Sequence, residues 1–261
     1  METGMRLGSP PHPALLAPHD PRKQPPDPMS SPMLPCSDPL AAVRAGAWFS
    51  QLPPALRQAL LDDGSLRRLV AGETLFARGD RFDGLYCVAS GTMQIHASGE
   101  SGKAAVLGLL EPGTWFGEIC LFDGLPRTHD ARAASAATLW HVPRTALAQR
   151  LAQQPAWWQA FGQLLAAKTR EAFHYVEEAQ LLPPPARVAR RLAAIAHGYG
   201  NLPDGSATRR VRIAQEQLAQ MLGLSRQTVN HALRELEAHG LLRLQYGGIE
   251  LLDLAALETL N

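Results

Sequence analysis

The sequence predicts an α+β protein in which a β-barrel or jelly roll is followed by a long helix and then by a helix-turn-helix. Three observations lead to this prediction. Short apolar runs recur between residues 65 and 142 and are separated by glycine-containing turns, as in antiparallel barrels. Apolar side chains then follow helical spacing over residues 155–182, and residues 213–236 form two short amphipathic segments around a glycine.

The size and composition of the chain favour two compact domains. It has 261 residues, 46% of them hydrophobic, and a formal net charge of +1, which neither demands nor excludes a nucleic-acid partner. From residue 183 to the end there are 9 Arg and 7 Asp or Glu, so this part carries 9 − 7 = +2. The arginines gather around the helix-turn-helix, where a basic surface favours DNA binding.

Cysteine usage and hydropathy predict the compartment. Three widely spaced cysteines, Cys36, Cys87 and Cys120, are typical of a reducing environment and argue against a disulfide framework. No apolar run reaches the roughly 20 residues of a membrane span, and the N-terminus lacks a basic start followed by an apolar core. We therefore expect a cytoplasmic protein without a membrane partner.

Residues 1–40 are expected to form a disordered, proline-rich tail. Residues 1–39 contain 11 prolines and no periodic apolar pattern, so they bury too little surface to offset the entropy of ordering them. A folded barrel domain is expected over residues 41–150, where a short helix or two lead into strands. The expected strands are residues 65–70, 73–77, 84–88, 92–96, 104–110 and 137–142.

A dimerisation helix is expected over residues 151–182. Its seam steps alternately by three and four residues, as in a coiled coil. The seam consists of Trp158, Phe161, Leu165, Lys168, Ala172, Tyr175, Ala179 and Leu182. The alternative is a helix packed on its own barrel, but this seam is longer than one small barrel covers, so a second copy is the expected partner. The proline run 183–185 ends the helix and forms a hinge before the last domain, residues 183–261.

Within residues 213–236, two helices are expected around a tight turn. Leu218, Ala219 and Leu222 share one face of the first helix. Gly223 allows the reversal, and Ser225 is a good N-cap for the second helix. The second helix has an apolar face of Val229, Ala232, Leu233 and Leu236 and a polar face of Arg226, Gln227, Asn230, His231 and Arg234.

This polar face carries side chains that read a DNA major groove. Arg226 can bond guanine N7 and O6 in a fork, and Gln227 or Asn230 can do the same to adenine N6 and N7. Ser225 and Thr228 are better suited to phosphates. We expect DNA contacts from Ser225, Arg226, Gln227, Thr228, Asn230 and His231. The alternative is an ordinary helical hairpin with a solvated polar face.

The segment GLSRQTVNHALRELE, followed by HGLLRLQYGGIEL, resembles the winged helix-turn-helix of the Crp/Fnr family of bacterial transcription regulators. The shared positions are Gly223, Ser225, Arg226, Thr228, Val229, Leu233, Leu236 and Gly240. One departure is Ala214, where the family usually has Ser or Thr as the N-cap of the first helix. This departure should cost about 1 kcal/mol unless Gln215 or Glu216 compensates.

Residues 112–128, PGTWFGEICLFDGLPRT, resemble the phosphate-binding cassette of cyclic-nucleotide-binding domains. Gly117 lets the backbone approach a ligand, and Arg127 with Thr128 offers a charged fork and a hydroxyl. By the family's pattern, Glu118 accepts from a ribose 2′-hydroxyl, and Gly117, Arg127 and Thr128 hold the cyclic phosphate. The alternative is that Glu118 and Arg127 pair across the loop while Gly117 makes a turn.

The base end of this expected site departs from the family. Cyclic-AMP-responsive members have a Thr-Ser pair on the long helix, and the matching positions here are Ala172 and Phe173, which lack hydroxyls. Three outcomes stay open: cyclic AMP held more loosely, another nucleotide such as cyclic GMP or cyclic di-GMP stacked on Phe173 or Tyr175, or no ligand. Haem is a further alternative, whereas three scattered cysteines do not support an iron–sulfur cluster.

The resemblance covers residues 41–252 and implies a homodimeric transcription regulator. It implies a cyclic-nucleotide-binding-like effector domain at 41–150, a winged helix-turn-helix at 183–261, and most base specificity at Arg226, Gln227 and His231. The implied partners are two-fold operator DNA, a second copy of the chain and RNA polymerase. No catalytic or metal site is expected. Two other classes stay open: a signal-binding protein whose helix-turn-helix contacts proteins, and an enzyme using His129 and Asp130.

Overall fold

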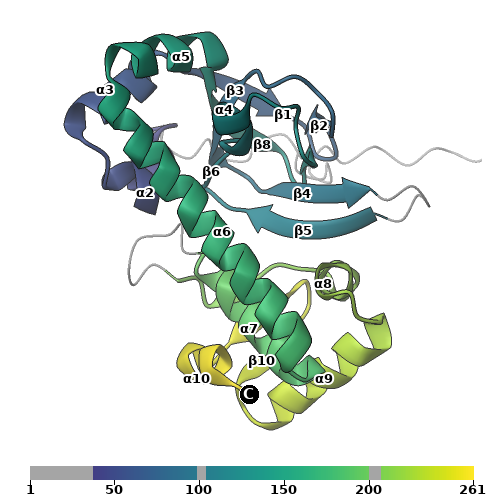
Figure 1. Ribbon diagram of the computed structural model, residues 1–261. Coiled ribbons are helices and arrows are strands. Elements are labelled where there is room, and N and C mark those ends of the chain that lie inside the picture. Colours follow the sequence, from purple (N-terminus) through teal and green to yellow (C-terminus); the bar gives the residue numbers. More distant parts are fainter. Residues whose placement is uncertain (1–37, 99–103, 200–206) are drawn as a thin grey trace, which may run out of the picture. The chain divides into compact units, whose positions relative to one another are not determined.

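The computed structural model describes residues 38–98, 104–199 and 207–261, whose helices and strands are drawn in Figure 1. The expected proline-rich tail, residues 1–40, lies outside these ranges except for residues 38–40, and Cys36 lies outside them as well. Within the described ranges, no helix is long and apolar enough to cross a membrane.

In the described part of the chain, three short helices precede the first strand. They are α1 (Ala41–Ala45), α2 (Ala47–Ser50) and α3 (Pro54–Asp62). Phe49, Leu56 and Leu60 are buried in one core cluster with Trp115, whose ring stacks on that of Phe49 with 5.6 Å between centroids. These helices therefore belong to the core of the barrel domain.

Among the described residues, the strands of the barrel domain form two four-stranded sheets with antiparallel neighbours, which confirms the expected jelly roll. One sheet has the order β1 (Ser65–Leu69), β8 (Ala137–Pro143), β3 (Gly84–Ser90) and β6 (Trp115–Phe116). The other has the order β2 (Thr74–Phe76), β7 (Asp130–Ala133), β4 (Met93–Ser98) and β5 (Ala104–Leu110). The sequence pattern does not reveal β6 and β7, because strands this short carry too little periodicity.

Residues from both sheets share one core. Tyr86, Met93 and Leu139 have no measurable exposure and belong to the same cluster as Phe116. This is the arrangement expected when alternate residues of two stacked sheets point inward. One short helix, α4 (Ile119–Asp123), lies between β6 and β7 in the chain and contains the middle of the expected cassette.

Two helices connect the barrel to the C-terminal part. They are α5 (Arg144–Gln153) and α6 (Trp158–Leu181), separated by a 3-10 turn, η1 (Pro155–Trp157). The long helix therefore begins at Trp158, and residues 151–153 belong to α5. Pro155 explains the interruption, because it cannot donate the hydrogen bond that continues α5 and is suited to the start of a new helix.

The expected seam of α6 is covered in part by its own chain, so its assignment to a partner helix is wrong for that part. Phe161 is 1% exposed and packs in the barrel core. Lys168 donates to a carbonyl of β6, and Tyr175 donates to a carbonyl near the C-terminus of the helix-turn-helix's first helix. By contrast, Phe173 and Val176 are 70% and 49% exposed. Phe173 and Val176 are not seam residues: they lie on a neighbouring apolar face of α6, and this is the face that the chain itself leaves uncovered.

The C-terminal part is a winged helix-turn-helix, as expected. Its helices are α7 (Pro184–Ala196), α8 (Gln215–Leu222), α9 (Arg226–Ala238) and α10 (Leu254–Thr259). Its strands β10 (Leu242–Gln245), β11 (Gly248–Leu251) and β9 (Arg210–Val211) pair antiparallel in that order. Leu192, Leu218 and Leu233 are fully buried in one cluster, which also contains Val106 and Leu109 of β5. Strand β5 is therefore packed against both the barrel and α8.

The turn between α8 and α9 has the expected chemistry. Gly223 has φ of 62°, in the left-handed region that favours glycine. The Ser225 hydroxyl accepts from the backbone N–H of Thr228 at 3.0 Å and so caps α9. The predicted inward residues of both helices are all buried: Leu218, Ala219, Leu222, Val229, Ala232, Leu233 and Leu236.

The start of α8 is stabilised differently from the expectation. The backbone N–H of Ala214 donates to the Gln217 side-chain oxygen at 3.1 Å. This is half of a capping box, which an alanine N-cap cannot complete because it has no acceptor. The compensation comes from Gln217 rather than from Gln215 or Glu216.

Candidate functional site

The polar face of α9 is open to solvent. Arg226, Gln227, His231 and Arg234 are exposed, and Asn230 is half-buried. Ser225 and Thr228 lie at the N-terminus of α9, where their hydroxyls are 2.7 Å apart. The six residues predicted to contact DNA are therefore contiguous along the first turns of one helix, the position from which a recognition helix reaches base edges.

Basic and aromatic side chains flank this helix. Arg209, Arg210 and Arg212 are exposed around β9, and Tyr246 is fully exposed in the turn between β10 and β11. The sequence analysis did not single out Tyr246. The sequence feature that could have identified Tyr246 is its position beside Gly247 in a turn between two strands. Core packing does not explain an aromatic residue at such a position.

A cavity of about 410 Å³ lies beside the cassette. Gly117, Glu118, Arg127 and Thr128, the four predicted effector residues, all line it. Other barrel residues, among them Phe76 of β2 and Ile95 of β4, line it as well, and the rest of the wall comes from β5, from α6 and from α7 with the turn after it. From these last elements, the polar side chains on the wall are Lys168, Glu171, Tyr175, Arg191 and Tyr199.

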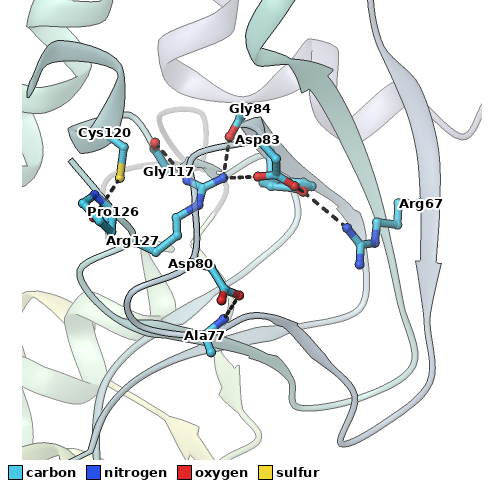
Figure 2. Close-up of polar contacts among 10 residues, drawn as sticks. Arg67, Ala77, Asp80, Asp83, Gly84, Gly117, Cys120, Pro126 and Arg127 are labelled. Atoms are coloured by element: carbon cyan, nitrogen blue, oxygen red, sulfur yellow. Dashed lines mark hydrogen bonds and ion pairs between the residues drawn. The ribbon is translucent and has the colours of Figure 1, made fainter. Parts of the chain in front are cut away.

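The guanidinium of Arg127 is buried beneath the cassette backbone. Figure 2 shows it directed toward Gly117, Gly84 and Asp83. Nη2 donates to Asp83 at 2.6 Å and to the Gly84 carbonyl at 2.7 Å, and Nη1 donates to the Gly117 carbonyl at 3.2 Å. A Cβ on Gly117, whose φ is 94°, would lie 2.6 Å from Nη1. Glycine is therefore required here for the arginine to pass, as well as for the backbone conformation.

Aromatic rings and an aspartate hold Arg127 in place. Its guanidinium carbon lies 4.2 Å from the centroid of Phe76, which is within range for a cation–π contact. Burial alone would raise the pKa of Asp83, but hydrogen bonds from Tyr86 and Arg127 outweigh burial and lower that pKa. The carboxylate is thus ionised at neutral pH and pairs with the arginine. Arg127 Nε is buried and has no hydrogen-bond partner among the described residues.

Glu118 pairs with the long helix, not with Arg127. Its carboxylate is buried and accepts from Lys168 Nζ at 2.8 Å, while the same ammonium group donates to the Trp115 carbonyl at 2.6 Å. The alternative pairing of Glu118 with Arg127 is therefore wrong. Lys168, which the seam prediction assigned to a partner helix, instead joins α6 to the cassette.

The far end of the cavity contains polar residues that the sequence analysis missed. Glu171 lies on α6, Arg191 on α7 and Tyr199 just after α7. Arg191 lies over the ring of Tyr175, 4.3 Å from its centroid. Ala172 lines the cavity, but Phe173 does not, so the expectation that a base could stack on Phe173 is wrong for this cavity.

A signal for Arg191 is present in the sequence. It lies three residues after Val188 and four before Ile195, in the middle of the apolar face of α7. A charged residue at such a position must either find a buried partner or line a cavity, because burial of an isolated charge is costly.

Hydrogen bonds join this end of the cavity to the helix-turn-helix. The hydroxyl of Tyr175 donates to the Met221 carbonyl at 2.7 Å, and Arg187 donates to the Leu222 carbonyl. These carbonyls belong to the last turn of α8, where no intrahelical donor is available. A displacement of α6 at Tyr175 would therefore act directly on α8.

His129 and Asp130, the residues of the alternative enzyme hypothesis, both have polar contacts within the barrel domain. Asp130 accepts from the Arg78 backbone N–H at 2.7 Å, and His129 is 2.9 Å from the Thr128 hydroxyl. Burial lowers the pKa of His129. In the part of the chain that the structure describes, no group of three or more His, Cys, Asp or Glu side chains is placed to hold a metal ion.

Comparisons with known proteins agree with this architecture. A cyclic nucleotide-binding domain model matches residues 66–154, and a Crp-like helix-turn-helix domain model matches residues 186–260. A CRP-like cAMP-activated global transcriptional regulator of Mycobacterium tuberculosis is 31% identical over 174 residues, which cover 67% of this chain and 78% of that protein. A cyclic AMP receptor protein of Thermus thermophilus is 30% identical over 190 residues, covering 72% of this chain and 84% of that protein.

Among solved structures, the c-di-GMP responsive global regulator CLP of Xanthomonas campestris has a similar fold. The TM-score is 0.60 at 24% identity, over 76% of this chain and 99% of that chain. The jelly roll with its cassette, joined to a winged helix-turn-helix with an open polar face, defines a DNA-binding transcription regulator of the Crp type. The chain belongs to the Crp/Fnr family.

Proposed function

We propose that the protein is a homodimer that binds a two-fold DNA operator through α9 and is controlled by a cyclic nucleotide in the 410 Å³ cavity. One observation carries the proposal: residues of the cassette, α6 and α7 line a single cavity, and Tyr175 in its wall bonds to α8. The effector part spans residues 41–150, the dimerisation helix lies within 151–182, and the DNA-binding part spans 183–261. RNA polymerase is the partner on which such a promoter-bound dimer acts.

Dimerisation is supported by the face of α6 that its own chain leaves uncovered. Phe173 and Val176 are largely exposed there, and Gly162, Ala166 and Thr169 precede them at intervals of four, three and four residues. This interval is that of a coiled-coil seam, and small residues allow close approach of a second helix. A two-fold pair of α6 helices would cover this face on both copies.

Base reading is assigned to the exposed positions of α9. Arg226, Gln227 and His231 face solvent, and Asn230 lies beside them. We assign guanine to Arg226 and adenine to Gln227, because their donors and acceptors match those bases in the major groove. Ser225 and Thr228, at the helix start, are assigned to phosphates.

Effector control is supported by the cassette. Gly117, Glu118, Arg127 and Thr128 meet at the cavity, and Arg127 Nε remains a donor for a phosphate. Arg127 pairs with Asp83 and Glu118 pairs with Lys168 of α6, so a ligand that binds at the cassette exchanges some of these pairs. Such an exchange is how a ligand can favour one arrangement of α6 and α8 over another.

The test is selection of DNA from a random duplex library by the full-length protein, followed by footprinting and titration at several salt concentrations. The proposal expects one two-fold site with half-sites about one helical turn apart and affinity that falls steeply with salt. Selection of no common sequence, with equal affinity for all duplexes, would contradict it and favour a helix-turn-helix that contacts proteins.

A further inference from the structure

The two ends of the effector cavity differ in chemistry. Lys168, which bonds to Glu118, marks the cassette end. Glu171 lies about 4.5 Å further along α6 and Tyr175 about 10 Å further, because a helix rises 1.5 Å per residue. A nucleotide whose cyclic phosphate lies at Gly117 and Arg127 would therefore extend its base toward Glu171 and Tyr175. This step rests on the proposed function, which places the phosphate at the cassette.

Arg191 provides hydrogen-bond donors at this far end. It is only 7% exposed, it lines the cavity, and its Nε has no hydrogen-bond partner among the described residues. Its guanidinium is held over the ring of Tyr175 at 4.3 Å from the centroid. An arginine has donors and no acceptor, so a ligand group that satisfies it must present acceptors.

Glu171 is the acceptor at the same end. It lines the cavity beside Arg191, but no hydrogen bond or ion pair of its carboxylate is found with the described residues. Burial raises the pKa of Glu171 to about 7, although Arg191 and Lys168 act against the shift. Glu118, in contrast, has its lysine within hydrogen-bond distance. The far end thus presents a carboxylate and an arginine whose guanidinium bonds to Tyr199 but keeps Nε as a donor for a ligand.

We propose that Arg191 and Glu171 recognise a guanine base, so that the effector is a guanine cyclic nucleotide. Guanine presents two acceptors, O6 and N7, which match the forked donors of Arg191. The adjoining edge presents two donors, N1–H and the 2-amino group, which match the carboxylate of Glu171. Both edges of guanine meet at O6. An arginine and a carboxylate at the same end of the cavity can therefore bind the two edges together.

Adenine fits this pair poorly. Its 6-amino group is a donor in the place of O6, so it would oppose the donors of Arg191, and N1 is an acceptor that would oppose the carboxylate of Glu171. Buried donors and acceptors left unmatched cost more than a matched pair gains, so the discrimination is asymmetric. The absence of hydroxyls at Ala172 and Phe173 is consistent with a base other than adenine.

Recognition by Arg191 also connects the ligand to the DNA-binding part. Arg191 lies on α7, which packs against both α8 and α9. A guanine held by Glu171 on α6 and Arg191 on α7 would bridge the two helices on either side of the hinge. The base itself would then favour one orientation of the DNA-binding part.

The test is calorimetric titration of the full-length protein with cyclic GMP, cyclic AMP and cyclic di-GMP. We expect a guanine ligand to bind at least about tenfold more tightly than cyclic AMP. Glu171→Gln and Arg191→Lys should each reduce that ratio to near one, mainly by weakening the guanine ligand. Glu177→Gln, an exposed position on the same helix, is the matched control and should keep the ratio. Thermal melts establish that each variant is folded.

The outcomes separate this inference from the proposed function. Cyclic AMP binding as tightly as cyclic GMP and cyclic di-GMP, or a preference that survives Glu171→Gln, overturns guanine recognition and leaves effector control intact. Tight binding of cyclic di-GMP together with weak binding of cyclic GMP supports guanine recognition and identifies the dinucleotide as the effector. Binding of none of the three overturns both the inference and the cyclic-nucleotide part of the proposed function.

Discussion

The recognition helix and the cassette end of the effector cavity hold their charged side chains in opposite ways. On α9, Arg226 and Arg234 are exposed and make no hydrogen bond or ion pair with the described residues. At the cassette, Arg127 is already paired with Asp83, and Glu118 is paired with Lys168. One site presents free charges to a partner, whereas the other keeps its charges satisfied inside the fold.

This difference corresponds to two kinds of binding. An exposed arginine can meet DNA with no change in the protein, and its loss affects contacts alone. A ligand at the cassette must exchange partners with buried pairs, and breaking such pairs is costly unless new ones form. The cavity is therefore suited to switching and α9 to reading. The following four predictions test this division, from the largest expected effect to the smallest.

The largest effect is expected from the uncovered face of α6. Phe173→Glu with Val176→Glu should give a folded monomer, because both side chains are exposed and only a second copy would bury them. Operator affinity should fall by roughly 100-fold or more, since the second half-site no longer binds in an intramolecular step. Sedimentation equilibrium and fluorescence anisotropy measure the two effects.

Two matched variants sharpen this test. Gln163→Glu with Arg170→Glu places two carboxylates on another exposed face of α6 and should leave the dimer intact. Phe161→Glu should instead unfold the barrel, because Phe161 is in its core. A Phe173 and Val176 variant that still sediments as a dimer at low concentration would contradict the assignment of this face.

The second effect concerns the free charges of α9. Arg226→Ala should cost about 1–3 kcal/mol of binding free energy at a guanine-containing step and little at sequences that lack it. Anisotropy titrations with the selected operator and single-base variants measure this loss. Arg144→Ala, which removes an exposed arginine at the start of α5, is the control. A uniform loss across all sequences would show that Arg226 contacts phosphate.

The third effect is on stability and depends on pH. The pKa of Glu171 is raised from 4.5 to about 7 in the folded protein, mainly by burial. Its stabilising contribution is therefore present below pH 4.5 and is lost as the pH rises through 7. Glu171→Gln should stabilise the ligand-free protein by about 1–2 kcal/mol at pH 8 and by less toward pH 5. Urea unfolding at both pH values measures the difference, and a pH-independent effect would contradict the assigned ionisation.

The smallest effect tests the connection between the two regions. Tyr175→Phe removes the hydroxyl that donates to the Met221 carbonyl and preserves the ring under Arg191. We expect nucleotide binding to persist while its effect on DNA affinity falls by about fivefold, the equivalent of one hydrogen bond of about 1 kcal/mol. Ser50→Ala removes an exposed hydroxyl on α2, which belongs to neither site, and is the control for loss of a hydroxyl. If the nucleotide changed DNA affinity by the same factor in the Tyr175→Phe variant, the cavity and the DNA-binding part would be connected through other residues.

The DNA-binding helix could be predicted from sequence because its determinants are local. The 3.6-residue period separates Val229 and Leu233 from Arg226 and Gln227, and Gly223 and Ser225 mark the turn. The structure buries the first pair and exposes the second. Each of these signals spans only a few residues, so no knowledge of the rest of the chain is needed.

The cavity could be predicted only in part, since its pairs join distant segments. The cassette resemblance located Arg127 and Glu118, but Asp83 and Lys168 lie 44 and 50 residues from them along the chain. No local pattern specifies such pairs. The same limit explains the error in the α6 seam, because periodicity shows that a face is apolar and does not show which surface covers it.

The most direct test of effector-controlled DNA binding is a thermodynamic cycle on the full-length protein. Operator affinity is measured by anisotropy with and without a saturating cyclic nucleotide, and nucleotide affinity is measured by calorimetry with and without operator. The account predicts that the nucleotide tightens DNA binding by about tenfold, and that DNA tightens the nucleotide by the same factor, a coupling of about 1.4 kcal/mol. Nucleotide binding that leaves operator affinity unchanged would contradict it.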